Sequence, residues 1–221
     1  LGVSPFLNQM AMFLVQITLN NTLTYYGALS HYCEDIPLAC VGVISKVNIL
    51  MLGFTLGISQ GCQPIFSYNY GARQYSRVRE AYRKAIVAAS VICCIAFVCF
   101  QLFPRPIVAL FDPSGSEEYF QFAERYFRIY MFMTLANAFQ PITANFFTSI
   151  GKAKRGALIA LTRQVIFLIP LILIFPLFLG IDGVMYAGPI ADSAAVVVAL
   201  ALVTREMKRM PHVDEPVAAD T

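Results

Sequence analysis

The sequence predicts an all-α integral membrane protein in which six transmembrane helices form one lobe, with both chain ends in the cytoplasm. The first observation is composition: 58% of the 221 residues are hydrophobic and 13% are charged, whereas a soluble domain carries about 25% charged residues. So few charges cannot cover a soluble surface of this size, and lipid must be the main solvent of the outer face. The second observation is a series of long apolar segments, and the third is the alternating charge of their connections.

The apolar segments match membrane dimensions, because a transmembrane helix needs about 20 predominantly apolar residues. Six segments qualify, and we predict spans at residues 5–26, 36–68, 85–103, 126–150, 158–179 and 184–203. The second span is longer than a bilayer requires, so we expect it to tilt or to project. We assign residues 1–209 to one six-helix membrane lobe and the polar residues 210–221 to a disordered cytoplasmic tail.

The connections alternate in charge along the chain. Basic residues follow the second, fourth and sixth spans, at Arg73, Arg77, Arg79, Arg83, Lys84, Lys152, Lys154, Arg155, Arg205, Lys208 and Arg209. Acidic residues follow the first, third and fifth spans, at Glu34, Asp35, Asp112, Glu117, Glu118, Glu124 and Asp182. An excess of Lys and Arg in short loops marks the cytoplasmic side. An even number of spans then places the amino end on that side as well.

The second predicted span has features that shape a helix rather than carry chemistry. Gly53, Gly57 and Gly61 recur every four residues and form one smooth face that lets another backbone approach closely. Pro64 is expected to bend the helix near its cytoplasmic end, and Gly71 can terminate it. The basic residues that follow are expected to hold the loop at the anionic inner leaflet.

Polar side chains within the predicted spans identify faces that avoid lipid. The first span carries Asn8, Gln9, Gln16, Asn20 and Asn21. The fourth carries Thr134, Asn137, Pro141, Asn145 and Thr148. Their spacings of three, four, four and three residues place them on one stripe of a helix, which Gln140 flanks. Two interpretations stay open, namely hydrogen bonds between helices and the lining of a substrate path. The candidates for the path are Gln16, Asn20, Asn137, Gln140 and Asn145.

Three ionisable residues, Lys46, Arg163 and Asp192, lie within predicted spans. At a rise of 1.5 Å per residue, Lys46 and Asp192 lie at similar depths of roughly 15 and 12 Å from the outer side, and Arg163 roughly 8 Å from the cytoplasmic edge. Because a charge at the bilayer centre costs at least about 2.5–3.5 kcal/mol, we expect Lys46 to pair with Asp192 and Arg163 to reach the interface. The pair is either structural, or Asp192 takes up a proton or a cation and Lys46 or Arg163 responds.

The end of the second span carries a recognisable motif. Gln63, Pro64, Asn69 and Gly71 stand in the pattern Q-P-x-x-x-x-N-x-G-A, which resembles the end of the second span in each half of MATE (multidrug and toxic compound extrusion) transporters. Two later segments resemble the fifth and sixth spans of a half: Arg163-Gln164 with Pro170, and Ala187-x-Pro189-Ile190-Ala191-Asp192.

The resemblance implies that the chain is the carboxy-terminal half of a twelve-helix, two-lobe antiporter in the plasma (inner) membrane. Its partners are then a missing amino-terminal six-helix lobe, small organic cations and the lipid bilayer. It implies export of drugs or toxic compounds in exchange for H+ or Na+, with no cofactor beyond that ion. In some members the first span of this half carries a carboxylate. Here it has Asn and Gln instead, which shifts the expected ion site towards the missing lobe.

Other classes of protein fit the sequence less well. A flippase of the same superfamily, acting on lipids or lipid-linked oligosaccharides, would favour several cations in its cavity, and only Lys46 and Arg163 qualify. An enzyme is not expected, because the two histidines, His31 and His212, lie in a loop and the tail without a titratable cluster. No cysteines stand at C-x-x-C spacing, so no metal site is expected. The net charge of +3 is too small to indicate nucleic acid.

Overall fold

The structure is a computed structural model that describes residues 3–29, 35–111, 113 and 115–211. The described residues form helices and short connections. In chain order the helices are α1 Val3–Ala28, α2 Asp35–Gly71, α3 Tyr75–Leu102, α4 Pro104–Phe111, α5 Glu117–Tyr130, 3₁₀-helix η1 Met131–Met133, α6 Ala136–Ser149, α7 Ala153–Leu161, π-helix η2 Thr162–Leu168, α8 Ile169–Leu179 and α9 Ile181–Arg209.

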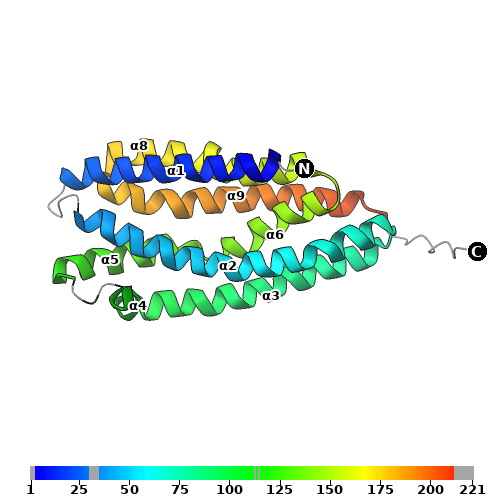
Figure 1. Ribbon diagram of the computed structural model, residues 1–221, viewed down its shortest axis with the longest axis horizontal. Coiled ribbons are helices and arrows are strands. Elements are labelled where there is room, and N and C mark those ends of the chain that lie inside the picture. Colours follow the sequence, from blue (N-terminus) through cyan, green and yellow to red (C-terminus); the bar gives the residue numbers. More distant parts are fainter. Residues whose placement is uncertain (1–2, 30–34, 112, 114, 212–221) are drawn as a thin grey trace, which may run out of the picture.

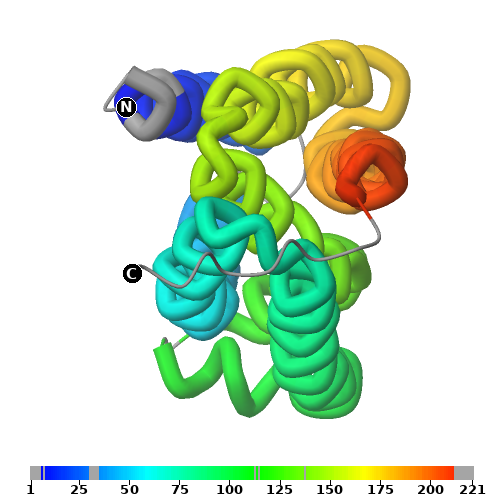
Figure 2. The backbone as a smooth tube through the Cα atoms, turned by 90° about the vertical axis from the view of Figure 1, so that its right-hand side faces the viewer, coloured from blue at the N-terminus to red at the C-terminus, as the bar shows by residue number. Residues whose placement is uncertain are grey.

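The long helices run roughly parallel to the long axis of the molecule (Figure 1). Seen from the end, α1, α7 and α8 form one row along the top, while α2 and α3 lie below, with α6 between the two rows (Figure 2). Helix α6 contacts α2, α3, α7 and α9, and α1 contacts α2, α7, α8 and α9. Helices α2, α6 and α9 each contact several other helices and together hold the bundle.

Four helical stretches are long and apolar enough to cross a membrane: Asp35–Gly71, Tyr75–Leu102, Ala153–Leu179 and Ile181–Arg209. They contain or overlap the predicted spans at 36–68, 85–103, 158–179 and 184–203. Helix α1 is continuous over the predicted span at 5–26. The count of six spans and the cytoplasmic position of the chain ends stay predictions.

The predicted span at 126–150 is not one continuous helix. The chain enters it through α5, tightens into η1 and resumes as α6 at Ala136. At the break the hydroxyl of Thr134 donates to the carbonyl of Met131 at 2.5 Å, and the amide of Thr134 donates to the same carbonyl at 3.1 Å. A hydroxyl that competes for a backbone carbonyl in this way disturbs the helical ladder.

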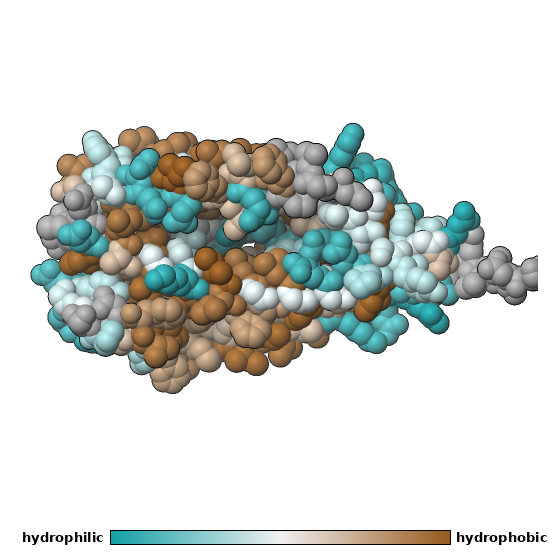
Figure 3. All heavy atoms as spheres, in the orientation of Figure 1, coloured by the Kyte–Doolittle hydropathy of each residue, from teal (hydrophilic) through white to brown (hydrophobic). Residues whose placement is uncertain are grey.

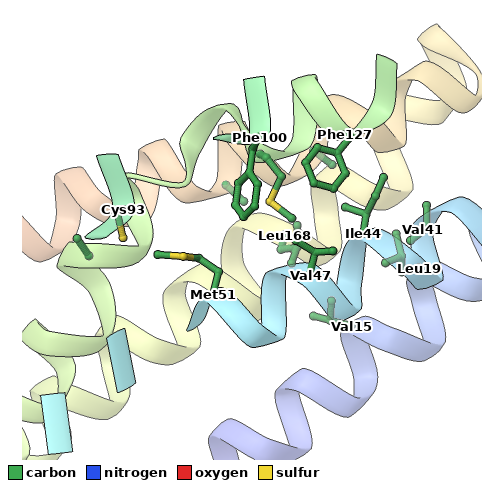
Figure 4. Packing of buried hydrophobic residues seen from close by; sticks show 14 of the residues in the cluster. Val15, Leu19, Val41, Ile44, Val47, Met51, Cys93, Phe100, Phe127 and Leu168 are labelled. Carbon is green, nitrogen blue, oxygen red and sulfur yellow. The ribbon is translucent and has the colours of Figure 1, made fainter. Parts of the chain in front are cut away.

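Buried side chains form a continuous seam between the helices. Helix α1 packs on α2 through Val15 and Leu19, which lie beside Val47 and Val41 (Figure 4). On the outside, large apolar residues such as Leu110 and Phe178 are exposed. An apolar exterior is expected when lipid is the solvent of the outer face.

Charged side chains fasten both ends of the bundle. At one end Glu206 of α9 is buried and accepts hydrogen bonds from Lys152 and Arg155. Arg79 of α3 donates to the carbonyls of Met210 and Pro211 at 2.9 and 2.7 Å. The start of the predicted tail is thus attached to α3, while residues 212–221 lie outside the described residues.

At the opposite end, ion pairs connect α4 with α5 and α5 with α9. Arg105 contacts Glu117 at 2.6 Å, and Arg125 contacts Asp182 at 2.8 Å. The hydrogen bond to Glu117 raises the pKa of Arg105. Both pairs are largely exposed, and exposed ion pairs contribute little to stability. They connect the ends of neighbouring helices at this end of the bundle.

Candidate functional site

A buried ion pair joins two helices in the interior of the bundle. The Nε of Arg163 donates to Oδ1 of Asp192 at 2.5 Å, and the two side chains are 11% and 10% exposed. Arg163 lies ten residues beyond Ala153, and Asp192 lies eleven beyond Ile181. At 1.5 Å per residue each is about 15–16 Å from the start of its helix, well inside the stretches Ala153–Leu179 and Ile181–Arg209, which are long and apolar enough to cross a membrane. Pairing therefore neutralises two charges where each alone would be most costly.

The chain geometry around Arg163 departs from a regular α-helix. In η2 the amide of Ile169 donates to the carbonyl of Gln164, five residues earlier. Pro170 follows directly and has no amide hydrogen with which to restore the α-helical ladder. π-Helical turns are rare and frequently occur at functional sites. The wider turn leaves Arg163 and Gln164, although adjacent in sequence, both lining one cavity.

The α9 side of the pair is also shaped by helix-disturbing residues. Pro189 removes a backbone donor three residues before Asp192, and the hydroxyl of Ser193 donates to its carbonyl at 2.7 Å. Gly188 faces the ring of Tyr130 so closely that a Cβ would lie 2.5 Å from a ring carbon. The absence of a side chain at Gly188 thus allows Tyr130 to pack directly against α9, next to the pair.

A cavity of about 120 Å³ lies beside this pair, between α1, α2, the end of α5, η2, α8 and α9. Its polar lining consists of Gln16, Ser45, Asn48, Tyr130, Arg163 and Gln164. On the surface, hydrophilic side chains border a hollow between α1 and α2 (Figure 3). A cavity of this size can hold several water molecules or a small ion, but it is smaller than the roughly 300–1,000 Å³ pockets of drug-sized ligands.

The prediction that Lys46 pairs with Asp192 is wrong. Asp192 forms its ion pair with Arg163 instead. Lys46 is exposed and makes no ion pair within the described part of the chain. The expectation that Arg163 reaches the interface is wrong as well. The guanidinium of Arg163 turns towards Asp192 instead, and its side chain is 11% exposed.

The other predicted path residues fall into two groups. Gln16 lines the cavity and donates to Asn20 at 3.1 Å. Asn145 donates to Ser59 at 2.7 Å, and the Gln140 amide donates to the carbonyl of Ile159 at 3.5 Å. The side chain of Asn137 lies outside the described residues.

These contacts divide the candidates by role. Gln16 of α1 lines the cavity, and Asn20, which is exposed, accepts its hydrogen bond. Asn145 joins α6 to α2, where Ser59 also donates to the carbonyl of Pro141 at 3.2 Å. The contacts of Asn145 are therefore of the kind expected from hydrogen bonding between helices.

The motif residues shape the end of α2. Gln63 and Pro64 are exposed, and the helix continues through Pro64 to Gly71. Asn69 is buried and donates to the carbonyl of Ile65 at 2.8 Å. Helix α2 ends at Gly71 as expected, but the left-handed residue that completes the turn is Arg73, with φ 57°.

Sequence reasoning missed several residues of the cavity. The sequence does not distinguish Tyr130, Ser45 and Asn48 from other polar residues, because hydroxyl and amide groups are common in membrane helices. Nothing in the spacing of these three residues marks them either. For Tyr130 a signal existed in Gly188, since a glycine inside an apolar helix often marks a close approach. Gln164 was noted only within the MATE-like segment.

Comparisons with known proteins agree with this architecture. The profile of the MatE family matches residues 9–174. The multidrug export protein MepA of Staphylococcus aureus is 22% identical over 203 residues, which are 92% of this chain and 43% of MepA. The chain thus spans less than half the length of the curated relatives it matches.

Solved structures show the same fold. An outward-facing multidrug resistance MATE family transporter of the MOP superfamily aligns with a TM-score of 0.85 at 20% identity, over 95% of this chain and 46% of that protein. The MATE multidrug transporter DinF-BH aligns with a TM-score of 0.79 at 31% identity, over 93% of this chain and 44% of that protein.

The expected half-length relationship is therefore confirmed, and so is the expectation of a transporter family rather than an enzyme family. The family match covers well over half of the chain. The protein is a member of the MatE family of membrane transporters.

Proposed function

We propose that the chain forms the carboxy-terminal lobe of a cation-coupled antiporter in the plasma membrane that exports small organic cations, drugs or toxic compounds. The observation that carries the proposal is the buried Arg163–Asp192 pair beside a polar cavity. The names of the relatives support the direction and the cargo, since MepA is a multidrug export protein.

In this proposal Asp192 is the residue that responds to the coupling ion. While Asp192 is charged, it neutralises Arg163 across η2 and α9. A proton or Na+ that binds Asp192 weakens this pair and leaves the guanidinium without its counter-charge in a low-dielectric interior. An unpaired charge there is costly, so the bundle gains free energy by moving Arg163. Helix η2 can bend at the π-turn and at Pro170. Water or an ion can bind in the cavity beside Arg163.

The exported cation binds elsewhere, between this lobe and the proposed amino-terminal lobe. The cavity beside the pair is too small for a drug-sized molecule. The exposed face of α2 suits a second lobe, because a Cβ added at Gly53, Gly57 or Gly61 would meet no atom within 4 Å. The side chain of Lys46, which also belongs to α2, is exposed as well.

An efflux assay on the full-length transporter tests the proposal. We would follow ethidium export from a pump-deficient host that expresses the parent, Asp192→Asn or Asp182→Asn at equal membrane levels. Asp182→Asn is the matched control, since it neutralises a carboxylate of the same helix that pairs with Arg125 at the bundle end. We expect Asp192→Asn to abolish export and Asp182→Asn to retain it.

Imposed gradients then identify the coupling ion. In proteoliposomes, we would apply a pH gradient or a Na+ gradient separately and measure cation uptake driven by each. Export that survives in Asp192→Asn under both gradients would contradict a coupling role for this carboxylate. A parent that is folded in the membrane but moves no organic cation would contradict the antiporter proposal itself.

A further inference from the structure

A surface groove of about 500 Å³ lies between α2 and α3. Its walls are mainly apolar or small side chains, namely Ile58, Cys62, Ile65, Ala81, Ala85 and Ala88. The three alanines all lie on α3, so the groove exists because α3 presents short side chains where it faces Cys62 and Ile65.

The groove is polar at one end and apolar at the other. Arg77, Glu80 and Lys84 lie in the first turns of α3, close to Asn69 near the end of α2, and Ala88 lies further along α3. Hydrophilic residues gather at this end of the molecule (Figure 3). From Arg77 to Ala88 is eleven residues, or about 16 Å along the helix. The apolar wall on α2 runs from Ile65 to Ile58, which is seven residues or about 10 Å along the helix. This apolar length fits within one leaflet, which is half of a hydrocarbon core about 30 Å thick.

The polar end carries an excess of positive charge. Glu80 is the one carboxylate that lines it, and its ion pair with Lys84 at 2.7 Å is exposed. Arg77 makes no ion pair within 4.0 Å among the described residues, and Arg83 flanks Lys84 in an adjoining hollow. Arg79 does not contribute, because its guanidinium holds the carbonyls of Met210 and Pro211. The groove is thus lined by two cations, Arg77 and Lys84, and one carboxylate, and Arg83 adds a third cation in the adjoining hollow.

We propose that this groove binds one anionic phospholipid of the adjoining leaflet. The headgroup phosphate lies between Arg77 and Lys84, and one acyl chain lies along Ile65, Cys62 and Ala85. The apolar walls supply the chain site, the cations supply charge complementarity, and the apolar part of the groove fits within one leaflet. The assignment does not depend on the transported substrate or on the role of Asp192.

Site-specific photo-crosslinking tests this assignment in the full-length transporter. We would place p-benzoylphenylalanine at Ile65, which lines the groove and is exposed, and reconstitute the protein in equimolar phosphatidylglycerol and phosphatidylcholine. After irradiation, mass spectrometry identifies the crosslinked lipid. The control position is Ile95, which is exposed on α3 and does not line the groove.

We expect phosphatidylglycerol to be enriched at position 65 and both lipids to appear equally at position 95. Replacing Arg77 or Lys84 by Gln should lower the enrichment about fivefold for each cation removed, since a juxtamembrane cation favours anionic lipid by about that factor. Lys154→Gln, which removes an exposed cation outside the groove, should leave the enrichment unchanged.

Three outcomes would overturn the assignment. Equal capture of both lipids at position 65 would mean that the groove is ordinary lipid-facing surface. Crosslinks from position 65 to peptides of the transporter itself would mean that protein, rather than lipid, covers the groove. Loss of enrichment in Lys154→Gln would also contradict it, because general surface charge would then explain the preference.

Discussion

Two buried carboxylates of α9, Asp192 and Glu206, are neutralised in different ways. Asp192 has one cationic partner, Arg163, with a cavity and a π-turn beside it. Glu206 has two partners, Lys152 and Arg155, whose side chains are half-exposed at the end of the bundle. Glu206 is the more buried carboxylate, at 2% exposed against 10% for Asp192, but its two partners are 36% and 38% exposed, whereas Arg163 is 11% exposed. Because both carboxylates are buried, our proposal that Asp192 is the coupling residue rests on the burial of its partner and on the neighbouring cavity.

The largest expected effect comes from removing one member of the interior pair. Arg163→Met leaves Asp192 without its partner, and the loss of one partner of a buried pair costs about 3–5 kcal/mol. We expect poor membrane accumulation and a lowered midpoint of thermal unfolding, measured by size-exclusion chromatography after heating. Arg163→Met with Asp192→Leu should recover most of the stability but not the transport. Recovery of transport in the double variant would make the pair merely structural.

A smaller effect is expected at the other carboxylate. Glu206→Gln keeps the shape of the side chain and loses its charge, so the expected loss of stability is about 1–3 kcal/mol. Efflux per folded molecule should stay close to that of the parent, measured by dye export normalised to membrane protein. If Glu206→Gln abolished export while the protein stayed folded, the contrast between the two carboxylates would fail.

The close approach at Gly188 predicts a packing effect of similar size. Gly188→Ala would place a Cβ 2.5 Å from a ring carbon of Tyr130, and such overpacking costs about 1–3 kcal/mol. A double-mutant cycle with Tyr130→Ala, read from thermal unfolding, should show that the cost depends on the ring. An unchanged cost in the Tyr130→Ala background would place the strain elsewhere.

The smallest expected effect concerns the contact between α2 and α6. Asn145→Ala removes the hydrogen bond to Ser59, and such bonds between membrane helices are worth about 0.6 kcal/mol. We expect unchanged export and an unchanged range of exported dyes. A narrower range of dyes would instead return Asn145 to the substrate path.

The sequence identified the ionisable residues inside the helices but not which of them meet. Asp192 and Lys46 were both placed near the midplane, yet α2 turns Lys46 outwards while η2 brings Arg163 to Asp192. A rise per residue fixes depth and says nothing about which side chains meet across helices. The π-turn could not be foreseen either, because Pro170 signals a disturbed helix but not its type.

Local signals performed well where the physical cause is itself local. The apolar runs located α2, α3, α7–α8 and α9, and Gly71 marked the end of α2. The break at Thr134 was missed because it depends on a hydroxyl bonding back to Met131, a choice that the surrounding apolar sequence conceals. The cavity was out of reach, since its lining comes from helices far apart in the sequence.

The most direct test of the central claim is ion flux coupled to substrate. In proteoliposomes that contain the full-length transporter, we would add an organic cation and record the opposing movement of H+ or Na+ for the parent, Asp192→Asn and Glu206→Gln. The account predicts flux in the parent and in Glu206→Gln and none in Asp192→Asn. Undiminished flux in Asp192→Asn would contradict it.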